Sequence, residues 1–380
     1  MIMRHAYLFI ATLTAGGAER VASLLANEWQ GYKGVTVHLV LIFDSDMFYH
    51  VSDSVQVVRL GVAENSRGLA RMWQLARASL RLRRLVRRNR PTFVLSFMNK
   101  YNVYCLASLA GTGTQVIVSE RDSPTEKGRP ITTLLRRVLY PFAAGVITQS
   151  MASKEFVKTN FRVGRVAVMP NPVTLQPTAQ SSGRLPVILS VARLVRKKGH
   201  ADLLRAFSRL EAPSWSLLLC GDGPLKPDLM ALVVQLGLEG RVTLCGTVQN
   251  VAEFYSTSSI FVLPSYFEGF PNSLAEAMVS GLPPISYDCP TGPGQIIQHG
   301  TNGLLVPLGD ITGLASAMQK LVDTPALRAS MGREARKLTS LVDCRTVCRA
   351  YFDSCIGFSG MSNGASRRRS ALGGGGRDER

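Results

Sequence analysis

The sequence has few acidic residues for its length, and this deficit argues against a neutral or acidic surface. Its 380 residues include 26 Asp and Glu against 44 Lys and Arg, which gives a net charge of +18. Such an excess indicates an anionic partner: nucleic acid, a phosphorylated substrate or a membrane surface. Hydrophobic residues make up 46% and charged residues 18% of the chain, so the composition is globular rather than disordered. The length suits two domains.

The sequence lacks a CxxC motif, although it contains seven cysteines. An odd and scattered set indicates reduced thiols in a cytosolic protein rather than a disulfide framework. Cys344 and Cys348 share one face of an expected helix, but no histidine lies near them, and we expect no metal site there. The "DSD" at 44–46 resembles a metal-binding DxD motif, but it follows a strand in the wrong context and is interpreted as a loop.

The sequence also lacks any run of 18 apolar residues, so we expect no membrane-spanning segment. Residues 1–20, "MIMRHAYLFIATLTAGGAER", are compatible with a signal peptide. We favour a first buried strand that ends in a glycine turn, because cleavage near Gly17 would remove the opening strand of the fold.

Apolar strand-like runs alternate with helical patterns along both halves of the chain. This alternation predicts parallel, doubly wound α/β sheets, and two such domains are expected to face a cleft that holds the ligand at the carboxyl ends of the strands. The expected strands are 6–13, 35–43, 92–98, 114–120, 145–150, 187–194, 215–221, 242–246, 260–264 and 283–287.

A Pro-, Ser-, Thr- and Gln-rich stretch separates the halves and marks a linker. The apolar content falls again near the end of the chain, which is typical of disorder. We therefore expect an N-terminal domain, a linker, a C-terminal domain, a helix that returns to the first domain, and a disordered basic tail, with bounds 1–170, 171–186, 187–340, 341–356 and 357–380.

The second half carries two cations directly after its first strand. "SVARLVRKKGH" places Arg193 and Lys198 five residues apart. Fixed cations at a strand end suit a diphosphate, whose negative charge grows as it departs as a leaving group. A solvated basic loop is the alternative interpretation.

The stretch "SYFEGFPNSLAEAM", residues 265–278, combines two carboxylates with a helix start. Pro271, Asn272 and Ser273 lead into the helix, so its free N–H groups form a potential anion site. Glu268 precedes this site and is a candidate ligand for sugar hydroxyls. Glu276 is either a ribose ligand or, with Ser273, half of a capping box.

The spacing of Glu268 and Glu276, with "EGFPNSLAEAMVSGLP" around them and Arg193 and Lys198 upstream, resembles the family 4 retaining glycosyltransferases of the GT-B fold. "GGAER" at 16–20 resembles the glycine loop of their N-terminal domain. "SYDCPTGPGQIIQHGTNGLLVP" at 286–307 is similar to members that assemble bacterial lipid-linked or surface glycans.

The resemblance implies that the N-terminal domain is the acceptor side and that the C-terminal domain binds the nucleotide sugar. It also implies roles for individual residues. Glu276 holds the ribose, Arg193 and Lys198 neutralise the diphosphate, and Glu268 touches the donor sugar. Asn272, Ser273 and Leu274 belong to the donor site, and Gly16 and Gly17 let the backbone approach the donor phosphates. Glu268, Arg193 and Lys198 are the implied catalytic residues, and no metal or other cofactor is implied, because cations and a helix end take the metal's place.

One region departs from the family pattern. Many relatives have a histidine in the N-terminal domain near the reacting sugar, whereas this chain reads "VSERDSP" at the corresponding place. We expect Glu120 and Arg121 to line the cleft or to contact the acceptor.

A basic helix is expected over residues 67–90, because this segment has nine arginines, interleaved apolar residues and no acidic residue. A run of positive charges without acidic residues repels itself. It therefore favours contact with an anion outside the protein over a helix face that is only solvated. We interpret it as a contact for an anionic membrane surface or an acceptor diphosphate, with these candidate residues: Arg71, Arg77, Arg81, Arg84 and Arg88.

Together these features predict an enzyme that transfers a hexosyl or N-acetylhexosaminyl group from a nucleotide sugar, UDP-linked in our interpretation. The expected acceptor is a polyprenyl-diphosphate-linked or surface oligosaccharide, and the expected location is the cytoplasmic face of the membrane, without specific nucleic acid. The alternatives are a sugar-nucleotide epimerase of similar fold and a basic nucleic-acid-binding protein.

Overall fold

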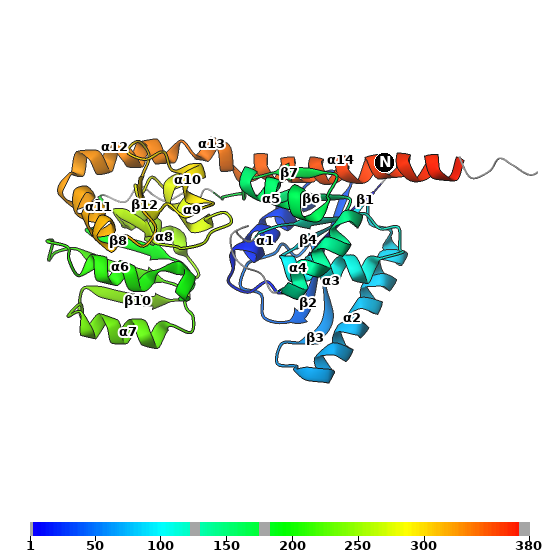
Figure 1. Ribbon diagram of the computed structural model, residues 1–380, viewed down its shortest axis with the longest axis horizontal. Helices are drawn as coiled ribbons and strands as arrows, with labels where there is room; N and C mark the ends of the chain where they lie inside the picture. Colours follow the sequence, from blue (N-terminus) through cyan, green and yellow to red (C-terminus); the bar gives the residue numbers. More distant parts are fainter. Residues whose placement is uncertain (1–2, 122–129, 175–182, 372–380) are drawn as a thin grey trace, which may run out of the picture. The chain divides into compact units, whose positions relative to one another are not determined.

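The protein, analysed as a computed structural model, divides into two compact units. The structure describes residues 3–121, 130–174 and 183–371, with side chains as far as Gly360. Unit 1 contains the described residues before Pro170 together with those from Arg345 onward, and unit 2 contains the described residues from Pro170 to Cys344 (Figure 1). Half of the predicted linker, 175–182, lies outside the described residues.

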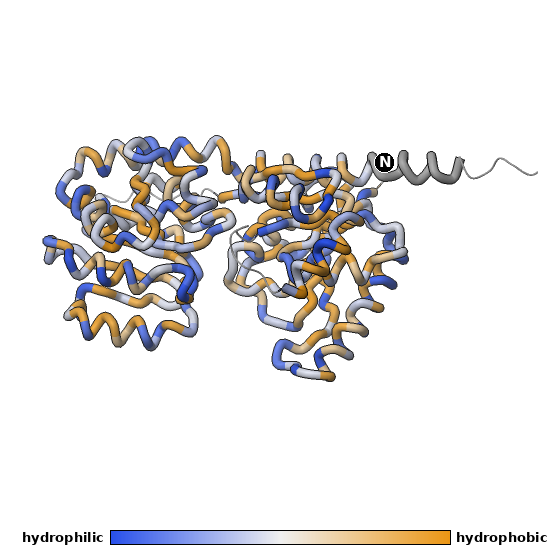
Figure 2. The backbone as a smooth tube through the Cα atoms, in the orientation of Figure 1, coloured by the Kyte–Doolittle hydropathy of each residue, from blue (hydrophilic) through white to orange (hydrophobic). Residues whose placement is uncertain are grey.

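Unit 1 is built on a seven-stranded parallel sheet in the order β3-β2-β1-β4-β5-β6-β7. Its central strands are apolar and buried on both faces, as expected for a parallel sheet covered by helices, and strands in both units appear as orange stretches of the tube in Figure 2. The strands are β1 (Arg4–Ile10), β2 (Val35–Asp44), β3 (Gln56–Ala63), β4 (Phe93–Phe97), β5 (Val116–Ser119), β6 (Gly145–Thr148) and β7 (Val166–Val168).

Helices cover both faces of this sheet. The chain crosses back from unit 2 through α14, which packs against α1: the Trp29 indole N–H donates to the Cys348 carbonyl over 2.8 Å, and the Trp29 ring meets Phe352 edge-on. The helices of unit 1 are α1 (Gly17–Gln30), α2 (Gly68–Asn89), α3 (Asn99–Leu109), α4 (Pro130–Leu139), the 3-10 turn η1 (Tyr140–Phe142), α5 (Met151–Phe161) and α14 (Cys344–Ala371).

Disorder was expected from Gly357 onward, and the structure instead describes a helix across this point. Helix α14 continues to Ala371, and residues 372–380 lie outside the described residues. Phe358 lies so close to Gly145 of β6 that a Cβ there would approach the ring to 2.3 Å, and Ser359 is buried. A few packed side chains anchor this helix, although the average composition of the segment is polar.

Unit 2 repeats the architecture with a six-stranded parallel sheet in the order β10-β9-β8-β11-β12-β13. Two apolar clusters fill the two faces of this sheet. The strands are β8 (Val187–Val191), β9 (Ser216–Cys220), β10 (Val242–Gly246), β11 (Ile260–Leu263), β12 (Pro284–Tyr287) and β13 (Leu304–Val306).

The helices of unit 2 connect these strands and close the domain. They are η2 (Arg196–Lys198), α6 (His200–Phe207), α7 (Lys226–Gln235), α8 (Val251–Thr257), α9 (Asn272–Val279), α10 (Pro293–Ile296), α11 (Ile311–Asp323), α12 (Pro325–Arg336) and α13 (Thr339–Val342).

The predicted fold class, two doubly wound parallel α/β domains, is confirmed. The sequence interpretation missed three edge strands: β3, β7 and β13. β3 alternates between exposed and buried residues, and the other two are three residues long. None of them has the continuous apolar run that marks a strand buried on both faces.

Candidate active site

The carboxyl ends of β8 and β11 define the candidate site in unit 2. These two strands are neighbours, and the chain leaves them in opposite directions, toward β9 and toward β12. Ligands of open α/β sheets bind where the strand order reverses in this way. The loop after β8 carries Arg193 and Lys198, and the loop after β11 carries Glu268.

Lys198 and Glu268 form an ion pair at this place. The Lys198 Nζ donates to the Glu268 Oε1 over 2.6 Å, and both side chains are largely buried. A buried charge is tolerated when it is paired and hydrogen-bonded. The structure therefore brings together two predicted site residues that are 70 positions apart in the sequence.

Arg193 has a different environment. Its side chain is exposed, and it makes no ion pair or side-chain hydrogen bond with any residue in the described ranges. The positive charge of Lys198 is thus already paired with a carboxylate, whereas the guanidinium of Arg193 is available to an incoming anion.

The backbone around Lys198 and Glu268 is held by contacts that the sequence analysis missed. The Tyr266 amide donates to the Lys197 carbonyl over 2.9 Å, and the Thr291 hydroxyl donates to the Glu268 carbonyl over 2.5 Å. Tyr266 also bonds through its hydroxyl to the carboxylate of Asp202, the third residue of α6. These contacts join the loops after β8, β11 and β12, and no local pattern signals them, because the partners are far apart in sequence.

Glycine is required at two positions beside the ion pair. Gly199 has a φ of +67°, and a Cβ there would lie 1.9 Å from the Pro264 carbonyl oxygen. Gly292 has a φ of +99°, and a Cβ there would lie 2.9 Å from the Cβ of Glu268. A side chain at either position would push the Glu268 loop away from Lys198.

Helix α9 presents free amide groups at its start. It begins at Asn272, and within the described residues no acceptor takes the N–H groups of Ser273 and Leu274. The Asn171 side chain donates to the Asn272 Oδ1 over 2.6 Å, which ties the segment after Met169 to the helix start. With these unbonded amides and the positive end of the helix dipole, the start of α9 has the geometry of an anion-binding site.

The capping-box alternative for Glu276 is wrong. Pro271 occupies the N-cap position and makes no side-chain cap, so Ser273 lies inside the helix rather than before it. The buried Glu276 carboxylate instead accepts a hydrogen bond from the Tyr255 hydroxyl over 3.1 Å. Glu276 is therefore not needed to cap α9.

In unit 1, Gly16 and Gly17 stand where β1 passes into α1. Gly16 is the N-cap, but its φ of −169° is extended backbone that any residue adopts. A Cβ at Gly16 would lie 2.2 Å from the Glu19 Oε2, so the absence of a side chain leaves room for this carboxylate at the helix start.

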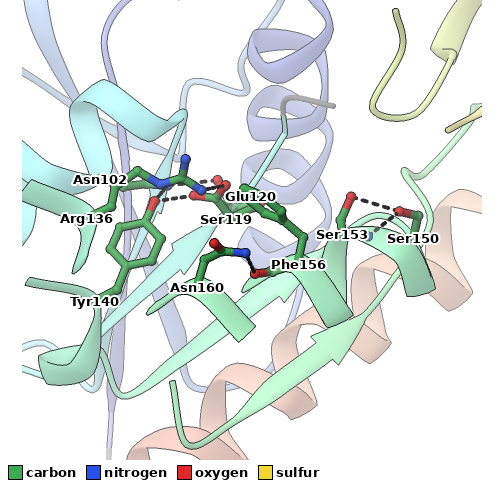
Figure 3. Close-up of polar contacts among 9 residues, drawn as sticks. All are labelled: Asn102, Ser119, Glu120, Arg136, Tyr140, Ser150, Ser153, Phe156 and Asn160. Carbon is green, nitrogen blue, oxygen red and sulfur yellow. Dashed lines mark hydrogen bonds and ion pairs between the residues drawn. The ribbon is translucent and has the colours of Figure 1, made fainter. Parts of the chain in front are cut away.

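The expectation that Glu120 lines a cleft needs correction. Glu120 is buried inside unit 1, where its two carboxylate oxygens accept hydrogen bonds from Arg136 and from the Tyr140 hydroxyl (Figure 3). Burial and the adjacent Glu120 carboxylate raise the pKa of Tyr140 well above its usual value, so the phenol remains a donor. Asn102 completes the cluster by donating to the Ser119 carbonyl over 3.0 Å.

Arg121 likewise contacts groups of unit 1. Its guanidinium lies over the Phe97 ring at 4.9 Å, and it donates to the Ser119 Oγ over 3.0 Å and to the Tyr351 hydroxyl of α14 over 3.5 Å. Glu120 and Arg121, the two charged residues that follow β5, therefore both make contacts within unit 1.

The predicted basic helix forms as α2, with Ala78, Leu82 and Val86 buried. Its candidate arginines differ in their surroundings. Arg71 lies over the Phe43 ring, Arg77 over the Trp73 ring, and Arg81 donates to the Leu60 carbonyl over 2.7 Å. Arg84 and Arg88 are exposed and form no ion pair or side-chain hydrogen bond in the described part of the chain.

The outer face of α2 is also partly apolar. Trp73 is 60% exposed, and Leu69, Met72 and Leu80 are exposed beside it. Among the residues that the structure describes, no helix is both long and apolar enough to cross a bilayer. The same residues include no group of three His, Cys, Asp or Glu side chains placed to hold a metal ion.

Comparisons with known proteins agree with this architecture. A family model described as "Glycosyltransferase Family 4" matches residues 15–177, and one described as "Glycosyl transferases group 1" matches residues 176–338. A solved structure of Anabaena HepE in complex with UDP-glucose superposes with a TM-score of 0.77 at 19% identity and covers 92% of this chain and 98% of that chain.

Two curated relatives differ in the share of this chain that they match. A Campylobacter jejuni N-acetylgalactosamine-N,N'-diacetylbacillosaminyl-diphospho-undecaprenol 4-alpha-N-acetylgalactosaminyltransferase is 26% identical over 371 residues, which are 93% of this chain and 100% of the relative. An exopolysaccharide phosphotransferase of Streptomyces coelicolor is 38% identical over 178 residues, but the match spans only 46% of this chain and 19% of the relative.

Two doubly wound parallel units, which superpose on the HepE structure, define a protein of the GT-B fold. The two matching models together span residues 15–338. The chain belongs to the family 4 glycosyltransferases, as the sequence analysis predicted.

Proposed function

We propose that the protein is a retaining glycosyltransferase that moves a sugar from a UDP-linked donor to a lipid-linked or surface oligosaccharide. The observation that carries this proposal is the Lys198–Glu268 ion pair beside the free amides of α9, at the switch point of unit 2. A cation and an oriented helix end at one place suit a diphosphate that gains charge as it leaves.

Each site residue has a role in this proposal. Arg193 and Lys198 contact the diphosphate, and the amides of Ser273 and Leu274 receive its oxygens. Glu268 contacts the donor sugar while its carboxylate holds the Lys198 ammonium in place. Glu276, oriented by Tyr255, accepts hydrogen bonds from ribose hydroxyls.

No metal is needed in this scheme, because fixed cations and the α9 dipole supply the positive charge that a metal would bring. UDP is the proposed leaving group, because HepE, which shares the fold, binds UDP-glucose. Closure of the site around the donor would exclude water and limit its hydrolysis. Gly16 and Gly17 are the proposed unit 1 contact for the donor phosphates.

The acceptor is proposed from the relatives. The Campylobacter enzyme is named for an undecaprenol diphosphate-linked acceptor and an N-acetylgalactosaminyl group. We infer the same class of acceptor here, with a hexosyl or N-acetylhexosaminyl group as the transferred sugar. The basic and apolar outer face of α2 then serves as a contact with the cytoplasmic surface of an anionic membrane.

The epimerase and nucleic-acid alternatives are less well supported. An epimerase needs acid and base groups on both sides of the sugar, whereas Glu268 is committed to Lys198. Nucleic-acid binding would use the arginines of α2 but would leave the unit 2 site without a role.

The test is thermal unfolding in the presence of UDP, UDP-sugars, ADP and GDP. UDP at about a hundredfold excess over its Kd adds about 2.7 kcal/mol to stability. Glu276→Gln should lower the affinity for UDP about tenfold, because the charged hydrogen bond to the ribose is lost. The thermal stabilisation by UDP should fall accordingly, while the unliganded protein remains folded. Glu253→Gln, on the exposed face of α8, is the matched control.

If no nucleotide stabilises folded protein, the proposal is wrong. If UDP stabilises the wild type and Glu276→Gln equally, the donor site stands but the ribose role of Glu276 does not.

A further inference from the structure

Unit 2 contains two cysteines that lie side by side at the carboxyl ends of neighbouring strands. Cys220 is the last residue of β9, and Cys245 is the fourth residue of β10. The register between the strands shifts at Cys245, which is the extra residue of a bulge between Leu244 and Gly246. Both cysteines pack into the same apolar cluster on one face of the sheet, and a hydrogen bond joins their thiols.

The two thiols differ in their access to solvent. Cys220 is 1% exposed, and burial, followed by the adjacent Cys245, raises the pKa of its thiol. Cys245 is half-buried, on the strand at the edge of the sheet (Figure 1). Of the seven cysteines, all of which the structure describes, Cys245 and Cys344 are half-buried and the other five are buried. A thiol reagent in solution therefore reaches Cys245 first, and Cys220 lies next to any bond that Cys245 forms.

The backbone permits a disulfide between these two residues. Neighbouring strands lie about 4.8 Å apart, and disulfides join residues whose Cα atoms are about 4.4–6.8 Å apart. The hydrogen bond between the thiols shows that the two side chains already point toward each other. The bulge lies in an edge strand, so its adjustment disturbs the hydrogen bonds to one neighbouring strand only.

The end of β9 also packs tightly against the loop that carries Arg193. A Cβ at Gly221 would lie 2.0 Å from the Ala192 carbonyl oxygen. The Ala192 amide donates to the Cys220 carbonyl over 3.0 Å, and the Gly221 amide donates to the Gly246 carbonyl over 2.7 Å. Because no free space separates these segments, a displacement at the end of β9 or β10 passes to the residue before Arg193.

We propose that Cys220 and Cys245 form a reversible disulfide that moves the loop after β8 and so lowers the affinity of unit 2 for its donor. A disulfide bond is shorter than the hydrogen-bonded contact that it replaces, so its formation draws the ends of β9 and β10 together. The guanidinium of Arg193, which is available to a diphosphate, moves with the loop. The loss of donor affinity rests on the proposed function, whereas the disulfide and the loop movement do not.

The oxidant in this proposal is a low-molecular-weight disulfide of the glutathione class. The Cys245 thiolate, its proton lost to water, attacks one sulfur of this disulfide and releases a thiolate that takes up that proton. The Cys220 sulfur then attacks the Cys245 sulfur of the mixed disulfide, and its proton leaves with the second thiol. Two protein thiols are thus oxidised to one disulfide, while the external disulfide is reduced to two thiols. Excess thiol reverses both steps.

The experiment begins with the full-length protein in glutathione buffers from fully reduced to fully oxidised. Free thiols are then blocked by alkylation in denaturant, and peptides are mapped by mass spectrometry. The Cys220 and Cys245 peptides should be linked, with the loss of two hydrogens, and should separate after treatment with dithiothreitol. Cys245→Ser should abolish the link. Cys344→Ser, at the other half-buried cysteine, is the matched control and should leave the link unchanged.

Two further measurements compare the oxidised and reduced forms. The Leu194 amide, which donates to the Asp222 carbonyl over 2.9 Å, should exchange with deuterium about tenfold faster after oxidation, because the loop after β8 is displaced. UDP should bind the oxidised wild type about tenfold more weakly, which corresponds to the loss of one charge-assisted hydrogen bond. Cys245→Ser should bind UDP alike in both buffers.

Absence of the linked peptide in oxidised, folded wild type would overturn the inference, as would a mixed disulfide that persists on Cys245. A linked peptide with unchanged exchange at Leu194 would overturn the loop movement, and equal UDP affinity in the two forms would overturn the loss of donor affinity. If the link and the exchange change appear but UDP does not stabilise the reduced protein, the donor site fails and the thiol pair stands.

Discussion

The two units share an architecture but use their buried ion pairs differently. In unit 2, Lys198 and Glu268 meet at the carboxyl end of the sheet, beside the free amides of α9. In unit 1, Glu120 and Arg136 meet inside the unit, where Tyr140 satisfies the remaining carboxylate oxygen. The comparison shows that a charged residue after a strand does not by itself identify an active site; its partner and its access to ligand do.

The exterior of the units differs as well. Unit 1 carries exposed apolar and basic residues together on α2 and α4, although Arg136 of α4 is buried. The candidate ligand-binding groups of unit 2 are instead collected in the loops after β8 and β11. We therefore expect substitutions in unit 2 to affect chemistry and those in unit 1 to affect stability and docking.

The largest effect is expected for Lys198→Ala, which removes the buried cation of the unit 2 pair. Turnover should fall about a hundredfold or more, because a preorganised charge at the leaving group is lost. Arg196→Ala, an exposed neighbour in η2, is the control. Turnover is measured with the donor that stabilises the protein most, and a near-normal rate for Lys198→Ala would contradict the proposed role.

The second prediction concerns the unit 1 pair. Arg136→Met leaves the Glu120 carboxylate buried without its cation and should cost about 3–5 kcal/mol of unfolding free energy. Arg349→Ala breaks an exposed pair with Asp353 within α14 of the same unit and should cost at most about 1 kcal/mol. Urea unfolding in a Trp215→Phe background reports on unit 1 through Trp29 and Trp73. Equal costs for the two variants would remove the distinction between buried and exposed pairs.

The third prediction uses one buried histidine from each unit. Burial, followed by the neighbouring His5, lowers the pKa of His38 to about 4; burial, followed by Lys198, lowers that of His200 to about 4. Both lie below the unfolded value of about 6.5. The unfolded chain therefore binds protons first, and stability is lost as pH falls from about 6.5 to about 4, by up to about 3 kcal/mol for each histidine.

This pH dependence is measured from urea midpoints of the wild type, His38→Gln and His200→Gln. Each substitution should reduce the slope between about pH 6.5 and 4, and His50→Gln on the surface is the control. Slopes that match the wild type in both buried-site variants would show that other groups cause the acid sensitivity.

The smallest effect is expected on the surface of α2. Arg84→Gln with Arg88→Gln should weaken binding to anionic vesicles by about 1 kcal/mol per residue, and the difference should shrink at high salt. Lys320→Gln with Arg333→Gln removes the same charge from exposed positions in unit 2. If both double variants bind alike, net charge rather than the α2 surface controls docking.

The central elements were predictable because their signals are local. Continuous apolar runs marked the central strands of both sheets, and the start of α9 followed from Pro271 and the residues after it. The edge strands β3, β7 and β13 escaped notice because half-exposed or very short strands lack such runs. The helical part of the tail was missed because Phe358 acts through a contact with Gly145 that composition does not reveal.

The candidate site was predictable only in part. Residues at the carboxyl ends of parallel strands meet at one edge of a sheet, so Arg193, Lys198 and Glu268 were identified from their places after strands. The contacts that hold them come from Tyr266 in the loop after β11, Thr291 in the loop after β12 and Asp202 in helix α6. No spacing rule links such distant positions.

By itself, the sequence determined the strand–helix alternation, the excess of positive charge and the family motifs, because each depends on neighbouring residues or on composition. Only the tertiary structure decided that Glu268 pairs with Lys198 and that Glu120 is enclosed with Arg136. The physical reason is that a buried charge must find an opposite charge in space, and the folded chain determines which one is within reach.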